Sequence, residues 1–418
     1  MIEQWLIDGE FEKVDQWLEE KEQQGRFDEL YEASESLIQY GFFERAASIF
    51  QAMRAHFPHE AQLFVDEASM RFELGEDDVA LELLEHVSEA DEEYVQALLT
   101  LADYYEANGM LELALGKMEK AYELLPHEPI VQYGYAELLR QAGKHREAIR
   151  LYEQLLQLKE SDFDEATLLG SMAMTLSEGA AYEEALPYFE RLLDVEELPA
   201  TQFAFAHALF QTEQYERAIA PLQRAIELDP DYYAAYTLLG QTYAQLEKNK
   251  EAYEVFERGL TRDRFEKGLY LAAGKMAIKL GKREEAIKHF EEALALDPEH
   301  LEARLNLASL YEYEERHEAI VELLATFENN TPLMDFYLAN AYEALEQYEK
   351  AGALYASIQE DLNTNVDYLN RYASFLVEEG RRDEALPLAQ KLLTLTEDPM
   401  WSDFVERMAY EDDFDRYE

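Results

Sequence analysis

The chain has 418 residues, of which 48% are hydrophobic and none is cysteine, and it carries 90 acidic against 36 basic residues for a net charge of −54. The lack of cysteine excludes a disulfide framework, thiol catalysis and cysteine-ligated metals. The acidity disfavours direct binding to nucleic acid, whose phosphates it would repel, and no apolar run of 18 residues predicts a membrane span.

The first predicted element lies within residues 1–26. Gly9 is followed by Phe11, Val14 and Leu18, which share one face of a helix. We expect this half-repeat to cap the apolar face of the unit that follows it. The start of the chain lacks the basic region and the apolar run of a signal peptide, so we expect a cytoplasmic protein.

A repeat of about 34 residues fills the chain from residue 27 to residue 399. One copy reads Gly109-x-Leu111-x-x-Ala114-x-x-x-Met118, with Pro126 after it. The alanine of this frame recurs at spacings of 32 to 37 residues, as Ala46, Ala80, Ala114, Ala148, Ala185, Ala218, Ala252, Ala286, Ala319, Ala351 and Ala385. So regular a spacing indicates one supersecondary unit stacked many times.

This frame predicts a pair of helices. A small residue such as Ala114 lets two helices cross closely, and large residues three or four positions away fill the space beside the crossing. Gly109 separates the two helices because it adopts left-handed backbone angles at little cost. Pro126 ends the second helix. Each pair then has an apolar face that only a neighbouring pair can bury.

The frame resembles the tetratricopeptide repeat, and the whole chain resembles the acidic, cytoplasmic YpiA-type tetratricopeptide proteins of Bacillus-like Firmicutes, which implies a bacterial protein. The resemblance implies an all-α fold, a right-handed superhelical solenoid of about eleven helix pairs with capping helices at both ends. It also implies a concave face that binds protein or peptide partners. The repeats are expected at about residues 27–60, 61–94, 95–128, 129–162, 166–199, 200–232, 233–266, 267–300, 301–332, 333–365 and 366–399.

The net charge has two interpretations. Glutamate-rich outer faces favour helix and solubility without any further role. Alternatively, the acidity selects and steers basic partners. A basic surface on a nucleic-acid machine, such as RNA polymerase or the ribosome, is then a more plausible target than nucleic acid itself.

The balance of charge inverts between Lys248 and Lys288, where 11 basic residues accompany 7 acidic ones. This inversion can be a drift of surface charge with local pairs such as Glu284 with Lys288. It can also mark a docking segment for an acidic peptide or for the protein's own N-terminal repeats. The second interpretation predicts head-to-tail self-association through residues 248–288.

The resemblance also points to groove residues, because the first helix of each tetratricopeptide pair lines the concave face. The candidate partner-binding residues are Tyr133, Phe203, His207, Gln241, Lys275, Asn306, Phe336, Asn340, Asn370 and Arg371. A two-carboxylate clamp of the family is not expected, since Thr237 and Leu271 occupy its lysine positions. The asparagines and Arg371 could hold a peptide backbone and a carboxylate, or simply contact water and neighbouring turns. The aromatic residues could form anchor pockets, or pack between repeats.

Three segments concern shape and the end of the chain. The repeat lengthens near residues 159–165 and shortens near 328–333, so we expect possible bends there. Residues 400–418 are expected to form a capping helix with an acidic tail, in which Trp401, Phe404 and Met408 cover the last repeat.

Motifs for chemistry are missing. The stretch from Gly268 to Met276 has one residue too many between its glycines for a phosphate loop, and Met276 stands where Ser or Thr would hold magnesium. We therefore expect no catalytic residue, metal or cofactor. The sequence predicts a non-enzymatic scaffold or adaptor that binds a protein segment in its groove, mainly in the second half. The alternative is a regulatory peptide sensor whose superhelix changes shape on binding.

Overall fold

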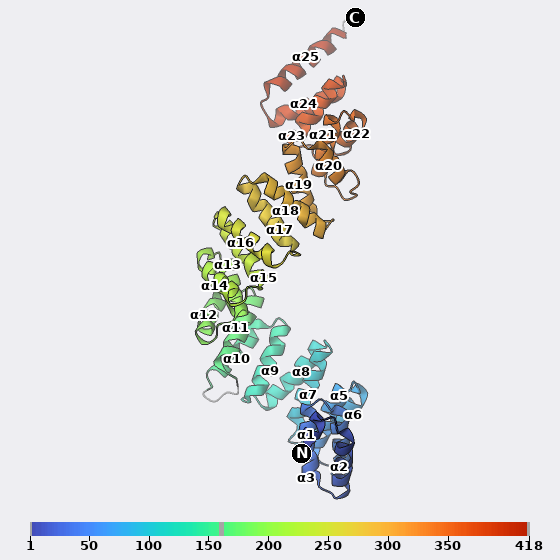
Figure 1. Ribbon diagram of the computed structural model, residues 1–418, viewed down its shortest axis with the longest axis vertical. Coiled ribbons are helices and arrows are strands. Elements are labelled where there is room, and N and C mark those ends of the chain that lie inside the picture. The colour runs from blue at the N-terminus through green and yellow to red at the C-terminus, as the bar shows by residue number, and fades with distance from the viewer. Residues whose placement is uncertain (1, 159–162, 416–418) are drawn as a thin grey trace. The chain divides into compact units, whose positions relative to one another are not determined.

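The computed structural model describes residues 2–158 and 163–415, with the side chains of 410–415 left aside. Within these residues the chain forms 25 helices and no strand (Figure 1). It divides into two compact units, Met1–Thr212 (unit 1) and Glu213–Glu418 (unit 2). The all-helical fold of repeated pairs confirms the prediction.

Unit 1 contains two helices, then five helix pairs and one further first helix. They are α1 (Ile2–Ile7), α2 (Phe11–Gln23), α3 (Phe27–Gln39), α4 (Phe43–His56), α5 (Ala61–Glu73), α6 (Asp77–Leu84), α7 (Tyr94–Ala107), α8 (Leu111–Leu124), α9 (Pro129–Gln141), α10 (His145–Leu156), α11 (Glu165–Glu178), α12 (Tyr182–Val195) and α13 (Pro199–Gln211).

Unit 2 begins with one second helix, continues with five pairs and ends in a longer helix. Its helices are α14 (Tyr215–Leu228), α15 (Tyr233–Gln245), α16 (Asn249–Arg262), α17 (Lys267–Lys279), α18 (Arg283–Leu296), α19 (Leu301–Tyr313), α20 (His317–Leu324), α21 (Pro332–Ala344), α22 (Tyr348–Ser357), α23 (Val366–Glu378), α24 (Arg382–Leu395) and α25 (Pro399–Asp415).

The recurring alanines explain the packing within each unit. Ten of the eleven, such as Ala148 and Ala351, are fully buried, as their place at a helix crossing requires. Ala319 is wrong as a core position: it is only partly buried, and Ile320 is fully buried instead. The second helix of this repeat, α20, has only eight residues. Ile320 follows the left-handed turn residue Glu315 by five positions, just as Ala148 follows Gly143, so the frame position of this repeat holds isoleucine in place of alanine.

The turns between the two helices of a pair adopt left-handed backbone angles, as the frame predicts. Gly143 has a φ of 73° in unit 1. Where the sequence lacks glycine, another residue takes the same conformation, for example Glu346 with a φ of 59° in unit 2. The repeat geometry therefore imposes the turn even on residues for which left-handed angles are unfavourable.

The terminal helices contact the repeats next to them. In unit 1, Ile2 and Val14 are buried in one cluster with Leu30 and Leu37. In unit 2, Trp401 of α25 is 3% exposed and belongs to the core cluster of the last repeats. These contacts support the capping roles that we propose for residues 1–26 and 400–418.

The two expected bends and the expected lack of a membrane span concern particular segments of the chain. The possible bend at 159–165 falls partly on residues 159–162, outside the described part of the chain. At 328–333, α20 ends at Leu324 and α21 begins at Pro332, and the bend stays a prediction. Among the described residues, no helix combines the length and the apolar character that crossing a membrane requires.

Candidate partner-binding surfaces

Four of the predicted groove residues join neighbouring first helices in unit 2. Lys275 of α17 forms an ion pair with Glu302 of α19. Asn340 Nδ2 of α21 donates to Glu312 Oε1 of α19 at 2.7 Å. The remaining contacts join α23 to its two neighbours: Arg371 Nη2 lies 3.0 Å from Glu343 Oε1, and Trp401 Nε1 donates to Asn370 Oδ1 at 2.7 Å. We call these four pairs the polar row.

The polar row changes the interpretation of its members. Asn370 and Arg371 remain exposed, yet each already has a partner on the adjacent helix. Asn340 is buried, 8% exposed, so the structure does not place it on an open groove surface. The row thus fixes one repeat against the next.

Tyr355 of α22 lies beneath the polar row. Its hydroxyl is 2.7 Å from both Asn340 Oδ1 and Glu343 Oε2, and can donate to one of them at a time. Burial, followed by repulsion from Glu343, raises the pKa of Tyr355. Phe336 packs beside it, 6% exposed, with ring centres 6.4 Å apart. Phe336 is therefore a core residue, which favours packing between repeats over an anchor pocket.

Two other unit 2 candidates lie outside this row. Asn306 of α19 donates to the carbonyl oxygen of Glu302 in its own helix at 2.7 Å. Gln241 is exposed on α15. Neither is brought together with Asn340 or Arg371 by a described contact.

Unit 1 has a comparable network around Glu137 of α9. Tyr152 donates to Glu137 Oε1 at 2.6 Å, Ser171 of α11 donates at 3.0 Å, and Arg140 Nη2 lies 2.9 Å from Glu137 Oε2. Burial alone would raise the pKa of Glu137, but the hydrogen bonds from Tyr152 and Arg140 outweigh it and lower that pKa. Arg140 also reaches Glu178 of α11 at 2.7 Å.

The aromatic candidates of unit 1 are half-buried between helices. The ring of Tyr133 stacks on Phe163 with centres 4.2 Å apart. Phe203 and His207 of α13 stack at 6.4 Å, and His207 meets Tyr182 edge-on at 5.8 Å. Burial lowers the pKa of His207, so its ring is neutral at pH 7. The contact of His207 with Tyr182 joins two repeats, whereas that of Phe203 with His207 lies within α13.

An acidic pair on α7 stands in contrast to these balanced networks. Asp103 and Glu106 are exposed on the first helix of the third repeat. In the described part of the chain, no basic group lies within 4.0 Å of either carboxylate, and Glu106 accepts only from Gln141 of α9. Partial desolvation, and then repulsion from Glu106, raises the pKa of Asp103. The pair is a site of unbalanced negative charge.

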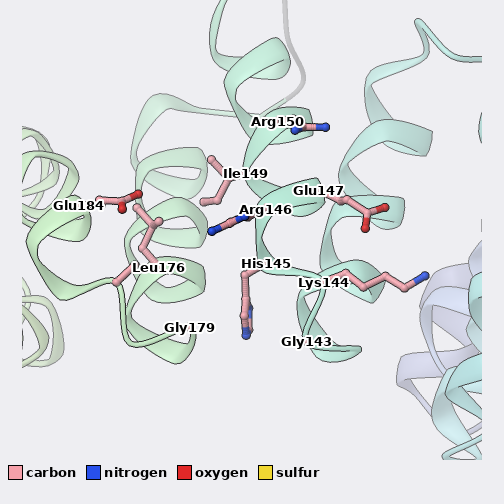
Figure 2. Close-up of a pocket in the computed structure, with 11 residues that line it drawn as sticks. Gly143, Lys144, His145, Arg146, Glu147, Ile149, Arg150, Leu176, Gly179 and Glu184 are labelled. Atoms are coloured by element: carbon pink, nitrogen blue, oxygen red, sulfur yellow. The ribbon is translucent and has the colours of Figure 1, made fainter.

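A cavity of about 710 Å³ opens beside α10 in unit 1 (Figure 2). We call it the basic cavity. It lies between α10 and the turn that joins α11 to α12, away from the predicted groove residues. It is lined by Gly143, Lys144, His145, Arg146, Glu147, Ile149, Arg150, Leu176, Gly179, Ala181 and Glu184. Sequence reasoning missed it, although residues 141–150 hold three basic residues and one acidic residue in a strongly acidic chain.

Among the described residues, no group of three or more histidine or acidic side chains could hold a metal ion. The residues that sequence reasoning missed in unit 2 are Glu312, Glu343 and Tyr355, whereas Trp401 was expected as a capping residue and its hydrogen bond to Asn370 was not. The sequence did offer a signal for Tyr355. It lies four residues after the repeat alanine Ala351, the position that the core residue Phe290 occupies after Ala286.

Consecutive helix pairs that cross at buried alanines and turn through left-handed residues define a tetratricopeptide repeat protein. A general tetratricopeptide repeat model matches residues 268–300, and a model for subunit 3 of the anaphase-promoting complex, cyclosome, matches residues 178–259. Tetratricopeptide repeat proteins are generally scaffolds for protein–protein interaction.

The particular family follows from closer matches. Models for YpiA-like tetratricopeptide repeats match residues 107–160, and models for their C-terminal repeats match 332–398. The tetratricopeptide repeat-containing protein YpiA of Bacillus subtilis (strain 168) is 32% identical over 390 residues, covering 93% of this chain and 92% of its own. The chain therefore belongs to the YpiA-like family of tetratricopeptide repeat proteins.

Solved structures match parts of the chain. YrrB, described as a tetratricopeptide protein with an unusual peptide-binding site, is 25% identical with a TM-score of 0.38, covering 44% of this chain and 95% of its own. The C-terminal part of a repeat protein from Cytophaga hutchinsonii is 16% identical with a TM-score of 0.45, covering 65% of this chain and 99% of its own.

Proposed function

We propose that this protein is a non-enzymatic cytoplasmic scaffold that binds a basic segment of a protein partner along the first helices of unit 1. The unbalanced pair of Asp103 and Glu106 carries the proposal. Basic surfaces of RNA polymerase or of ribosomal components are candidate partners, because they combine strong positive charge with protein surface.

The electrostatics of α7 support this choice of surface. The raised pKa of Asp103 means that its charged form lacks the stabilisation that a neighbouring cation would give. A lysine or arginine of a partner would supply it, whereas Arg371 already balances Glu343 in unit 2. The net charge of the first 100 residues, with 26 acidic and 6 basic side chains, would steer a basic partner to the same unit.

The exposed unit 2 candidates keep a secondary role in the proposal. Gln241, Lys275, Asn370 and Arg371 would form a separate contact surface for a partner within unit 2. Self-association through residues 248–288 stays a prediction, although several of its cations are already engaged, such as Lys267 with Asp297 and Arg283 with Tyr313.

The test uses the full chain and a fluorescein-labelled peptide of alternating lysine and glycine, followed by fluorescence anisotropy. Asp103→Asn combined with Glu106→Gln should weaken binding roughly tenfold at low salt. Glu112→Gln combined with Glu119→Gln, on the second helix α8, changes the net charge equally and should cost less than about twofold. An equal loss in both variants, or no binding by the native chain, would contradict the proposed surface.

The pH dependence gives a second measurement. A bound cation favours charged Asp103, so affinity should fall as the pH is lowered toward the raised pKa of Asp103, at a higher pH than for an ordinary aspartate. The variant that combines Asp103→Asn with Glu106→Gln should lose less affinity over the same change of pH. Identical pH profiles would contradict the role of Asp103.

A further inference from the structure

The basic cavity has a surplus of cations that the described residues of unit 1 do not pair. Lys144, Arg146 and Arg150 have no carboxylate within 4.0 Å in the described part of the chain. Elsewhere in unit 1, Arg140 has two carboxylate partners and Arg191 pairs with Glu165 at 2.7 Å. With acidic residues so abundant, three neighbouring cations left without partners mark a surface suited to negative charge from outside.

The cavity also has an apolar part. Ile149 of α10, Leu176 of α11 and Ala181 before α12 lie among its lining residues. A volume of about 710 Å³ is within the range of cavities that bury a ligand of moderate size. The lining therefore suits a ligand that combines negative groups with an apolar side chain.

One end of the cavity is closely packed. The ring of His145 lies against the turn at Gly179, where an added Cβ would come within 3.0 Å of His145 Cδ2. The Nδ1 atom of His145 is buried and has no hydrogen-bond partner within the described residues. This contact gives the cavity a defined wall and a polar atom that a ligand could reach after a small ring movement.

The placement of the cations decides between two kinds of anion. Figure 2 shows the head groups of Lys144, Arg146 and Arg150 spread around α10 and not converging on a single point. A single phosphate needs converging donors to bind tightly. Several carboxylates spaced along a chain match separate cations, and Glu147 and Glu184 at the cavity would further disfavour a compact dianion.

We propose that the basic cavity binds a short acidic segment of a partner protein. Its carboxylates would pair with Lys144, Arg146 and Arg150. An apolar side chain next to the carboxylate at Arg146 would contact Ile149 and Leu176, which lie on the same side of α10 as Arg146 in Figure 2. The surface is formed mainly by a second helix and has the opposite charge to the pair on α7. It therefore goes beyond the proposed function and does not depend on it: the scaffold would bind a basic and an acidic partner at different places.

The experiment measures binding of a fluorescein-labelled peptide in which glutamate and aspartate alternate with leucine. The full chain should bind it, and Arg146→Glu with Arg150→Glu should weaken binding at least about tenfold. Lys117→Glu with Arg191→Glu, on α8 and α12, makes the same change in net charge outside the cavity and should cost about twofold or less. Equal losses in both variants would overturn the proposal, as would no binding by the native chain.

Two further arms identify the ligand chemistry. Replacing leucine by serine in the peptide should weaken binding severalfold, while inorganic phosphate at millimolar concentration should displace little of the leucine peptide beyond the effect of equal ionic strength. Displacement by phosphate well beyond that effect would show a simple anion site and overturn the proposal. Thermal melts check that the variants are folded, and Arg146→Lys with Arg150→Lys should retain part of the binding. The lysine–glycine peptide should bind the Arg146 and Arg150 variants no more weakly than the native chain, which separates this result from the test of α7.

Discussion

The fourth and tenth repeats solve the same packing problem with different partners. In both, a tyrosine lies four residues after the repeat alanine and reaches the first helix of its own pair. Tyr152 in unit 1 donates to Glu137, whose charge is balanced by Arg140 of the same helix. Tyr355 in unit 2 lies between Asn340 and Glu343, and the balancing charge comes from Arg371 of the following repeat. Both networks reach the following repeat, the first through Ser171 and Glu178 of α11. The repeat frame fixes where the tyrosine lies, while its neighbours decide whether the cation that balances the glutamate comes from the same repeat or from the next.

The largest effect should come from the feature that both repeats share. Ala148→Glu and Ala351→Glu each bury an unpaired charge at a helix crossing where the native side chain is fully buried. Each should lower the free energy of unfolding by about 3–5 kcal/mol. Urea unfolding followed by circular dichroism measures the loss, and Ala356→Glu, at an exposed position on α22, serves as the control. A loss as small as the control's would show that the alanine frame is misassigned.

Removing the tyrosine hydroxyls should lower the free energy of unfolding by smaller amounts, which differ between the two repeats. Tyr355→Phe removes the donor that Asn340 Oδ1 has in the structure, and should cost about 1–2 kcal/mol. Tyr152→Phe should cost less, about 0.5–1 kcal/mol, because Glu137 keeps hydrogen bonds from Ser171 and Arg140.

The same unfolding measurement, with exposed Tyr348→Phe as a control, tests this order of effects. If Tyr152→Phe proved the more costly change, the two networks would not differ in the way that their contacts indicate.

The smallest effect concerns the turns of the same two repeats. Glu346→Gly should stabilise unit 2 by about 0.5–1 kcal/mol, because glycine adopts a φ of 59° without the penalty that glutamate has. Gly143→Ala should destabilise unit 1 by about 1 kcal/mol, and the cause would be the backbone alone, since an added Cβ meets nothing within 4 Å. Thermal melts that moved in the opposite directions would contradict the assignment of these turns.

The sequence was sufficient for the helix pairs because their determinants are local. The alanine spacing and the turn glycines depend on period and residue size. The spacing failed at Ala319, because the frame position five residues after the left-handed Glu315 is occupied by Ile320. The resemblance to the tetratricopeptide repeat rests on the same regular spacing of alanines.

The side-chain networks were less predictable. The family pattern assigns Asn340, which directly follows Ala339, to the groove. Asn340 is nevertheless buried, because Tyr355 of the second helix packs against it and donates a hydrogen bond to it. Asn306 lies two residues before Ala308, so it occupies a different place on its helix from that of Asn340. The basic cavity brings together residues from α10, α11 and α12, and no single stretch of sequence displays that combination.

The polar row has a consequence for how such a chain can evolve. The alanine crossings are nearly the same at every repeat, so duplication or loss of a whole helix pair leaves compatible apolar surfaces. The row is different at each junction: a lysine meets a glutamate, then an asparagine meets a glutamate, then an arginine meets a glutamate, and last an asparagine meets a tryptophan. Exchanging two repeats would separate these pairs. These pairs therefore favour one order of the repeats from α17 to α25, even though the repeats share one frame.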